Sequence, residues 1–267
     1  MIRVEDAHRV RLLTLDRPDQ LNAFNEALYD ATTDALIDAS ADPGIAVVVI
    51  TGTGRAFSAG TDVVEMAGRN TGTTVDGRHG FGGLIDHLVA FPKPLICAVN
   101  GIALGIGATM LGLSDLVLMA STARIRCPFT ALAVAPEAAS SFTFPLLMGR
   151  QQATWTLMSS EWLSAAECRE AGLAWKVCEP DQLLDETLAA ARLLAAKPLA
   201  SLLECKRTIC AALADPIAAA RARENEAFRR LMGAPANVEG LTALAERRAP
   251  DLIGVDTRQP VTVEDHR

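Results

Sequence analysis

The sequence predicts an α/β protein whose main sheet is largely parallel. In the first half of the chain, short apolar runs alternate with segments of helical periodicity, which is the spacing of β-α-β crossover connections. The second half is mostly helical in pattern. The 267 residues suffice for one large domain, or one domain with an appendage, that buries enough surface to fold without disulfide or metal staples.

Four apolar runs are expected to be strands: Val10–Leu15, Ile45–Thr51, Leu95–Val99 and Leu116–Ala120. The run Ile45–Thr51 is dominated by β-branched residues, as in a strand buried on both faces. Between the first two runs, Leu28–Ala39 predicts a helix, because apolar residues recur at three- and four-residue spacing.

Three later segments predict helices: Gln182–Ala196, Leu199–Leu213 and Pro216–Leu231. Pro198 and Pro216 separate them. The segment Ala67–Gly83 is rich in Gly, Thr and Arg and predicts a long loop, which in a compact domain is usually functional or mobile. Residues beyond Ala249 are polar and predict a loose tail.

Composition excludes several classes of protein. The charge of −7, from 25 basic and 32 acidic residues, disfavours bulk nucleic-acid binding. No apolar stretch approaches the length of a membrane span, and the N-terminal residues contain no signal region, so we expect a cytoplasmic protein. The six cysteines form no CxxC pair, which favours reduced, buried thiols over a disulfide or metal site.

Two glycine-flanked turns follow predicted strands. The first is Thr51–Asp62, TGTGRAFSAGTD, and the second is Asn100–Ala108, NGIALGIGA. Neither matches the GxGxxG or Walker pattern, so a dinucleotide or P-loop site is not indicated. Glycines also serve ordinary tight turns, and two packing turns are therefore an alternative.

Together these segments resemble the enoyl-CoA hydratase/isomerase family, also called the crotonase superfamily. The resemblance extends from Val10 to Pro250 and includes RPDQLNA at Arg17–Ala23, KPLICAVNGIALGIG from Lys93, and the segment Leu163–Val177. It implies an α/β ClpP-like spiral of ββα units in residues 1–197. It also implies a C-terminal helical trimerisation region in residues 198–252, and residues 253–267 are the expected loose tail.

For function, the resemblance implies an acyl-CoA thioester as substrate, no separate cofactor because CoA is part of that substrate, and a homotrimer or hexamer. By motif match, the backbone N–H groups of Ala59 and Ile106 form a hole for an enolate oxygen. The family usually has Gly at the second position, and the Ile106 side chain is expected to narrow the pocket. The further substrate-binding residues implied are Gln20, Leu21, Ala23, Ser58, Gly60, Thr61, Asp62, Gly105 and Phe129.

The family's hydratases use two glutamates, and the matching positions here are Thr109 and Phe129. Neither side chain transfers a proton usefully, so the hydratase machinery is expected to be missing. One carboxylate, Glu137, interrupts an apolar stretch. Its segment Pro136–Pro145, PEAASSFTFP, is similar to the peroxisomal type of Δ3-Δ2-enoyl-CoA isomerase, in which one glutamate is the base.

The sequence therefore predicts a Δ3-Δ2-enoyl-CoA isomerase with Glu137 as base, in an apolar pocket formed by Phe129, Phe142 and Phe144. The alternatives are an enoyl-CoA hydratase or another crotonase-type activity, and a non-catalytic acyl-CoA-binding subunit. For Glu137 itself, the alternative is an acid that stabilises a helix N-terminus.

Several further residues have more than one interpretation. Asp62 also fits a turn or capping acid. Arg17 and Arg55 are candidates for neutralising phosphates of CoA. The three tryptophans, Trp155, Trp162 and Trp175, are expected to be core or interface anchors.

Overall fold

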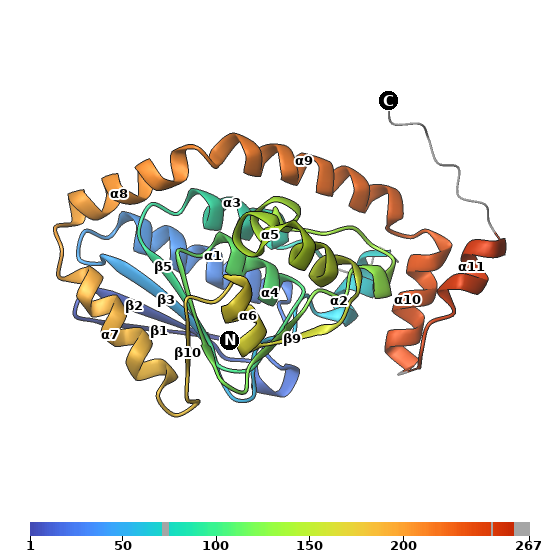
Figure 1. Cartoon of the computed structure of the whole chain (residues 1–267), viewed down its shortest axis with the longest axis horizontal. Helices are drawn as coiled ribbons and strands as arrows, with labels where there is room; N and C mark the ends of the chain where they lie inside the picture. Colours follow the sequence, from blue (N-terminus) through green and yellow to red (C-terminus); the bar gives the residue numbers. More distant parts are fainter. Residues whose placement is uncertain (71–74, 247, 259–267) are drawn as a thin grey trace.

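Two sheets form the framework of the computed structural model, which describes residues 1–70, 75–246 and 248–258 (Figure 1). The larger sheet has the strand order β1-β2-β3-β5-β7-β10, and only the β1–β2 pair is antiparallel. Its strands are β1 (Ile2–Ala7), β2 (Val10–Leu15), β3 (Val47–Gly52), β5 (Leu95–Val99), β7 (Leu116–Ala120) and β10 (Lys176–Cys178). The prediction of an α/β fold with a largely parallel sheet is confirmed.

A smaller sheet has the strand order β4-β6-β8-β9. Its strands are β4 (Ala56–Ser58), β6 (Ile102–Leu104), β8 (Arg124–Arg126) and β9 (Trp162–Ser164). Three of its strands each follow a strand of the larger sheet in the chain. The chain thus passes from β3 to β4, from β5 to β6 and from β7 to β8, and each pair is followed by helical structure. This repetition is the expected spiral of ββα units, and it brings the turns after β4, β6 and β8 together.

The predicted strands agree closely with the structure. Residues of β3 and β5 are almost all fully buried, which explains why apolar, β-branched runs in the sequence located them so well. Each fully buried Val, Leu or Ile side chain stabilises the fold by about 1.5–3 kcal/mol relative to exposure. The framework that carries the turns is therefore rigid.

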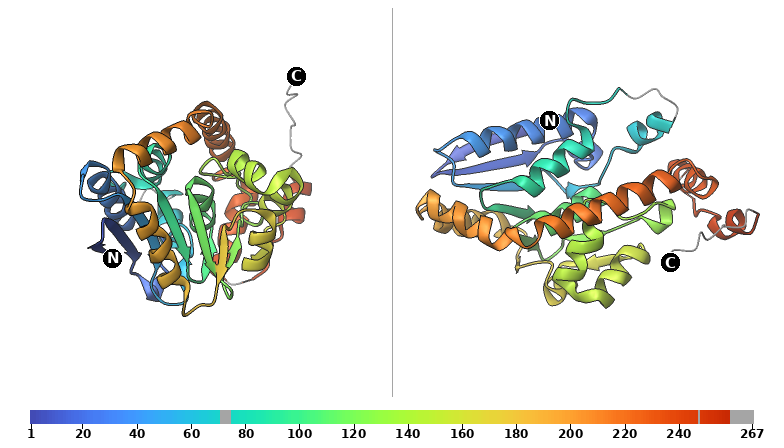
Figure 2. Two further views of the ribbon diagram at one scale, coloured as in Figure 1. Left: turned by 60° about the vertical axis from the view of Figure 1, so that its left-hand side comes forward. Right: turned by 90° about the horizontal axis from the view of Figure 1, so that it is seen from above.

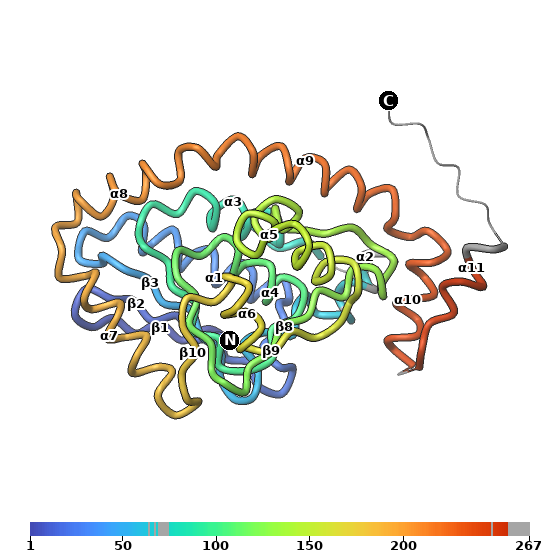
Figure 3. Tube along the Cα trace, viewed as in Figure 1, coloured from blue at the N-terminus to red at the C-terminus, as the bar shows by residue number. Residues whose placement is uncertain are grey.

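Helices cover the larger sheet and continue into the C-terminal region (Figures 1 and 3). The helices before the C-terminal region are α1 (Glu26–Ala41), α2 (Val63–Asn70), α3 (Gly80–Ala90), α4 (Ile106–Thr109), α5 (Ser140–Met158), α6 (Ala165–Ala171) and α7 (Leu183–Ala195). The 3-10 helices are η1 (Pro18–Gln20), η2 (Met110–Leu113) and η3 (Thr130–Leu132). Helix α7 packs on β3 and β5, and α1 packs on α3.

The C-terminal region consists of α8 (Leu199–Ala211), α9 (Ala214–Leu231), α10 (Pro235–Glu246) and α11 (Leu252–Arg258). Seen from above, α9 crosses the molecule between α3 and α5 (Figure 2, right). Arg221 of α9 forms an ion pair with Asp86 of α3 at 2.6 Å, and α9 also packs on α5. None of the helices in the described part of the chain combines the length and apolar character needed to span a bilayer.

Two predicted irregular segments contain helix. The predicted loop Ala67–Gly83 begins inside α2 and ends inside α3, and its residues 71–74 lie outside the described residues. Helix α11 occupies the start of the predicted loose tail, and residues 259–267 lie outside the described residues. Both segments are too polar or glycine-rich for their helical period to stand out in sequence.

The cysteines are free thiols, as expected, but they are not all buried. Cys97, Cys127, Cys168 and Cys178 are buried, whereas Cys210 is half-buried and Cys205 is exposed on α8. Burial raises the pKa of the Cys97 thiol to about 12, so this thiol is unreactive at neutral pH.

Candidate active site

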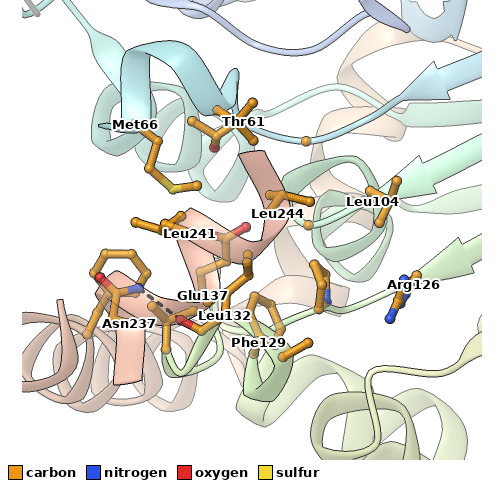
Figure 4. A pocket seen from close by; sticks show the side chains of 18 of the residues that line it. Thr61, Met66, Leu104, Arg126, Phe129, Leu132, Glu137, Asn237, Leu241 and Leu244 are labelled. Atoms are coloured by element: carbon orange, nitrogen blue, oxygen red, sulfur yellow. Dashed lines mark hydrogen bonds between the residues drawn. The ribbon is translucent and has the colours of Figure 1, made fainter. Parts of the chain in front are cut away.

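A cavity of about 530 Å³ lies where the turns after β4, β6 and β8 meet the C-terminal helices (Figure 4). Its lining is mainly apolar, and only a few polar groups reach it. The apolar side chains come from Val63, Met66, Phe81, Leu104, Phe129, Leu132, Val134, Trp162, Phe228, Met232, Leu241 and Leu244. Such a lining suits an apolar ligand that a small number of polar groups orient.

Helix α10 closes one side of this cavity. The Asn237 side-chain amide donates to the Leu132 carbonyl at 2.8 Å, shown as a dashed line in Figure 4. The side-chain oxygen Oδ1 of Asn237 accepts from the Gly233 N–H at 2.9 Å. Gly240 allows close approach, because a Cβ atom there would lie 3.0 Å from the Ala131 carbonyl oxygen. The C-terminal region therefore completes the cavity of its own chain.

The turn after β4 presents the N–H of Thr61. Phe24 pairs with this turn: its N–H donates to the Gly60 carbonyl at 2.7 Å, and its carbonyl accepts from the Asp62 N–H at 2.8 Å. In such a pair the N–H of the intervening residue, Thr61, points to the other side. No acceptor for it exists among the described residues, and Thr61 lines the cavity.

This finding corrects the predicted first donor. The N–H of Ala59 donates to the Leu21 carbonyl at 2.9 Å and is not free for a ligand. Ser58 is fully buried, and its hydroxyl donates to the Asn22 carbonyl at 2.9 Å and accepts from the Gly60 N–H. Ser58 and Ala59 thus hold the turn in place, and Thr61 presents the available N–H.

Tyr29 supports the same turn, although sequence reasoning did not single it out. Its hydroxyl and that of Thr61 are 2.8 Å apart, and its ring stacks on Phe24 with centroids 5.0 Å apart. Burial, followed by the charge of Glu137, raises the pKa of Tyr29. Tyr29 is therefore a neutral phenol that positions Thr61.

The turn after β6 presents the N–H of Ile106. Gly105 adopts φ +49°, a left-handed conformation that favours glycine. Its carbonyl accepts from the N–H groups of Ala108 and Thr109, both at 2.9 Å, while the N–H of Ile106 at the start of α4 has no acceptor among the described residues. The Ile106 side chain is fully buried in the core and does not line the cavity, so the expected narrowing of the pocket is wrong.

Glu137 faces the cavity between these turns and the C-terminal helices (Figure 4). A Cβ atom placed on Gly105 would lie 3.7 Å from Glu137 Oε1, so the carboxylate lies beside the second turn. No described residue donates a hydrogen bond to it. Burial, followed by the charge of Glu224, raises its pKa from 4.5 to about 8. Such a pKa suits a group that both accepts and releases a proton near neutrality.

The backbone after Glu137 is strained. Ala138 and Ala139 both adopt left-handed conformations, with φ of 57° and 59°, which costs about 1–2 kcal/mol per non-glycine residue. Glu224 of α9 offsets this cost, because its carboxylate accepts from the N–H groups of Ala139 at 2.7 Å and Ser141 at 2.8 Å. These contacts fix the direction in which the chain presents Glu137.

The two positions that match hydratase glutamates offer no carboxylate. Thr109 is fully buried, and its hydroxyl oxygen lacks a hydrogen-bond partner among the described residues. Phe129 lines the cavity with an apolar ring. Phe142 and Phe144, expected beside Glu137, do not line the cavity. The apolar lining of the cavity that Glu137 faces includes instead Phe129 and, from α10, Leu241 and Leu244.

Comparison with known proteins agrees with this geometry. A family model described as enoyl-CoA hydratase/isomerase matches residues 5–254. The chain therefore belongs to the enoyl-CoA hydratase/isomerase family. Membership makes it an enzyme of the crotonase type, with hydratase or isomerase activity on acyl-CoA thioesters.

Individual relatives cover between 78% and 93% of this chain. The 1,2-epoxyphenylacetyl-CoA isomerase of Escherichia coli K12 is 32% identical over 92% of this chain and 95% of its own. The solved enoyl-CoA hydratase EchA8_6 of Mycobacterium marinum is 57% identical over 78% of this chain and 98% of its own, with a TM-score of 0.75. The enoyl-CoA hydratase/isomerase of Pseudoalteromonas atlantica T6c is 33% identical, covers 93% and 98%, and has a TM-score of 0.87.

Some residues that the family motifs implied do not line the cavity, namely Gln20, Leu21, Ala23, Ser58 and Asp62. Gln20 is exposed, so its expected contact with CoA outside the cavity stays a prediction. Asp62, a predicted substrate-binding residue, forms an ion pair at 3.2 Å with Arg17, a candidate for binding a phosphate of CoA. Each of the two charges therefore already has a partner. Ala59, Gly60, Thr61, Gly105 and Phe129 do line the cavity.

The sequence did not predict the wall of the cavity that strands β6, β8 and β9 form. Leu104, Arg126 and Trp162 all line the cavity, and strand pairing places them in a row across β6, β8 and β9. Trp162, which the sequence predicts as a core or interface anchor, is part of the cavity wall. Trp155 and Trp175 are 57% and 50% exposed, so neither is a core residue.

Proposed function

We propose that this protein is a Δ3-Δ2-enoyl-CoA isomerase that uses Glu137 as its single base. The observation that carries the proposal is the Glu137 carboxylate, which lies beside Gly105 with a pKa raised to about 8. The positions of the hydratase glutamates hold Thr109 and Phe129. One carboxylate suffices for an isomerase, whereas hydration of a double bond needs a water activated by the protein.

The proposed reaction moves the double bond from C3–C4 to C2–C3. Glu137 removes a proton from C2, and the electron pair of that C–H bond is delocalised onto the thioester oxygen as a dienolate. The N–H groups of Thr61 and Ile106 hold this oxygen and stabilise its charge. Protonated Glu137 then delivers the same proton to C4, so the carboxylate is regenerated and no atom is gained or lost.

The experiment that tests the proposal offers a 3-enoyl-CoA and a 2-enoyl-CoA to the same preparation. Isomerisation of the first without hydration of the second is the expected result. Hydration of 2-enoyl-CoA would instead favour an enoyl-CoA hydratase, the name given to the Mycobacterium marinum relative. Thioester binding without either reaction would favour a non-catalytic acyl-CoA-binding subunit.

The proposal includes no separate cofactor and a cytoplasmic location, and both stay predictions. It also includes assembly as a homotrimer or hexamer. Large apolar side chains are exposed on the helices: Leu146, Trp155 and Met158 on α5 are 54–64% exposed, and Ile209 on α8 is 71% exposed. Burial of such side chains between subunits supports association.

A further inference from the structure

The charged wall of the cavity points to the class of acyl group that the enzyme takes, and this inference rests on the proposed function. Arg126 is opposite Leu104 on one neighbouring strand and Trp162 on the other. All three side chains line the cavity, and Figure 4 shows Arg126 at the opposite edge of the group from Met66 and Asn237. A guanidinium therefore stands in an otherwise apolar wall.

The Arg126 guanidinium contacts a backbone carbonyl and an aromatic ring. Its Nε donates to the Ser160 carbonyl, and its Cζ lies 5.7 Å from the centre of the Trp162 ring. No carboxylate within the described residues pairs with it. Arginine side chains that are half-buried in this way are usually satisfied by a carboxylate or phosphate, which their planar fork binds with two hydrogen bonds.

The place of Arg126 identifies which anion would meet it. The Arg126 carbonyl accepts from the Gly105 N–H at 3.1 Å. Arg126 is therefore next to the turn that presents the Ile106 N–H. Neighbouring strands are about 4.8 Å apart, a spacing much shorter than the pantetheine arm that separates the thioester from the phosphates of CoA. The phosphates of CoA are therefore too far from the thioester to meet Arg126. An anionic group of the ligand that meets it belongs to the acyl chain.

We propose that Arg126 binds a carboxylate at the far end of the acyl group, so that the preferred substrates are CoA monothioesters of dicarboxylic acids. The chain of such a substrate would run along Leu104 from the oxyanion turn. Trp162 supports the guanidinium through its ring face. The carboxylate of the substrate would then lie against the Arg126 guanidinium.

Calorimetric titration with saturated, unreactive ligands tests this inference independently of turnover. Three ligands are compared: hexanoyl-CoA, free CoA and the mono-CoA thioester of adipic acid. The adipic thioester differs from hexanoyl-CoA only in having a carboxylate in place of the terminal methyl group. Wild type is expected to bind the adipic thioester more tightly than hexanoyl-CoA. Arg126→Met should weaken the adipic thioester by about ten- to a hundred-fold, the range for a hydrogen bond to a charged group, and leave hexanoyl-CoA nearly unchanged.

Arg124→Met is the matched control, because Arg124 lies on the same strand and stacks on Trp162 at 4.1 Å but does not line the cavity. It should leave all three affinities nearly unchanged. Arg126→Gln is the substitute if the Met variant does not fold. It also removes the charge but retains a side-chain amide as donor toward Ser160, and it should show the same selective loss of affinity for the adipic thioester.

Equal affinity of wild type for the two thioesters would overturn the inference. A parallel loss for both thioesters and free CoA in Arg126→Met would overturn it too, since Arg126 would then contact a CoA phosphate while the proposed function stood. If no CoA compound bound to wild type, the proposed function itself would fail.

Discussion

Glu224 of α9 holds the segment that carries Glu137, and, after burial, its negative charge is the second cause of the raised pKa of Glu137. Two N–H groups bind the Glu224 carboxylate, whereas no described residue donates to that of Glu137. Hydrogen bonds to the ionised form favour it, and burial without them favours the neutral form. The pKa of Glu137, the group that faces the cavity, is therefore raised by burial and further by the charge of Glu224.

Glu137→Gln tests the base directly. Glutamine keeps the shape of the side chain but does not accept a proton at neutral pH, so the isomerase rate should fall by about two to four orders of magnitude. Affinity for a saturated acyl-CoA should change little, because the N–H groups of Thr61 and Ile106 remain. The measurement is a steady-state rate with a 3-enoyl-CoA, with calorimetry as control. Near-full activity would show that Glu137 is not the base.

Glu224→Gln should move the pH dependence of the reaction. A base works in its ionised form, so kcat/KM of wild type should rise with pH through the free-enzyme pKa of Glu137, about 8. Removing the neighbouring negative charge lowers that pKa, and the rise should move to lower pH. A pH–rate profile for both proteins measures the shift. An unchanged profile in a folded variant would contradict electrostatic coupling between the two glutamates.

The sequence located the segments of the site better than the atoms that act. The motif at Phe57–Thr61 marked the first oxyanion turn, but the pairing of this turn with Phe24 decides which N–H is free. That pairing joins residues far apart in the chain, and local pattern does not reveal it. For the same reason the motif alone predicts Ala59 as the first donor, whereas the structure presents the N–H of Thr61.

Length and tertiary contact explain the other omissions. Strands β4, β6, β8 and β9 have three residues each, too few for a period to be visible. Alternation in Arg124–Arg126 does place both arginines on one face of a strand, which is a sequence signal for the charged wall. The contribution of α10 to the cavity depends on the Asn237 contact with Leu132 and had no signal in sequence.

Thr109→Val should stabilise the protein. The hydroxyl of Thr109 is buried without a hydrogen-bond partner among the described residues, and such a group costs about 1–3 kcal/mol. Valine has nearly the same shape, so the melting temperature should rise by about 2–6 °C. The isomerase rate should not change, because Thr109 does not line the cavity. A lower melting temperature would show that the hydroxyl makes a hydrogen bond in solution.

Sedimentation velocity at micromolar concentration tests the proposed assembly. Exposed apolar side chains on α5 and α8 favour association, and we expect a trimer or hexamer without a large monomer fraction. Replacing Trp155 and Met158 by Lys should weaken association, since two charges would be buried at an interface. A wild-type protein that sediments as a stable monomer would contradict the proposal.

Gly60→Ala tests the oxyanion turn against a matched glycine elsewhere. Gly60 adopts φ +90°, and a Cβ atom there would lie 3.0 Å from the Leu104 carbonyl oxygen, so alanine should displace the turn that presents the Thr61 N–H. Loss of one oxyanion donor costs about 10²–10³ in kcat. Gly82→Ala in α3 is the control: a Cβ atom there meets nothing within 4 Å, and alanine in a helix should stabilise by about 0.5–1 kcal/mol without affecting the rate. Equal rates for both variants, with both proteins folded and binding acyl-CoA, would remove Thr61 from the oxyanion hole.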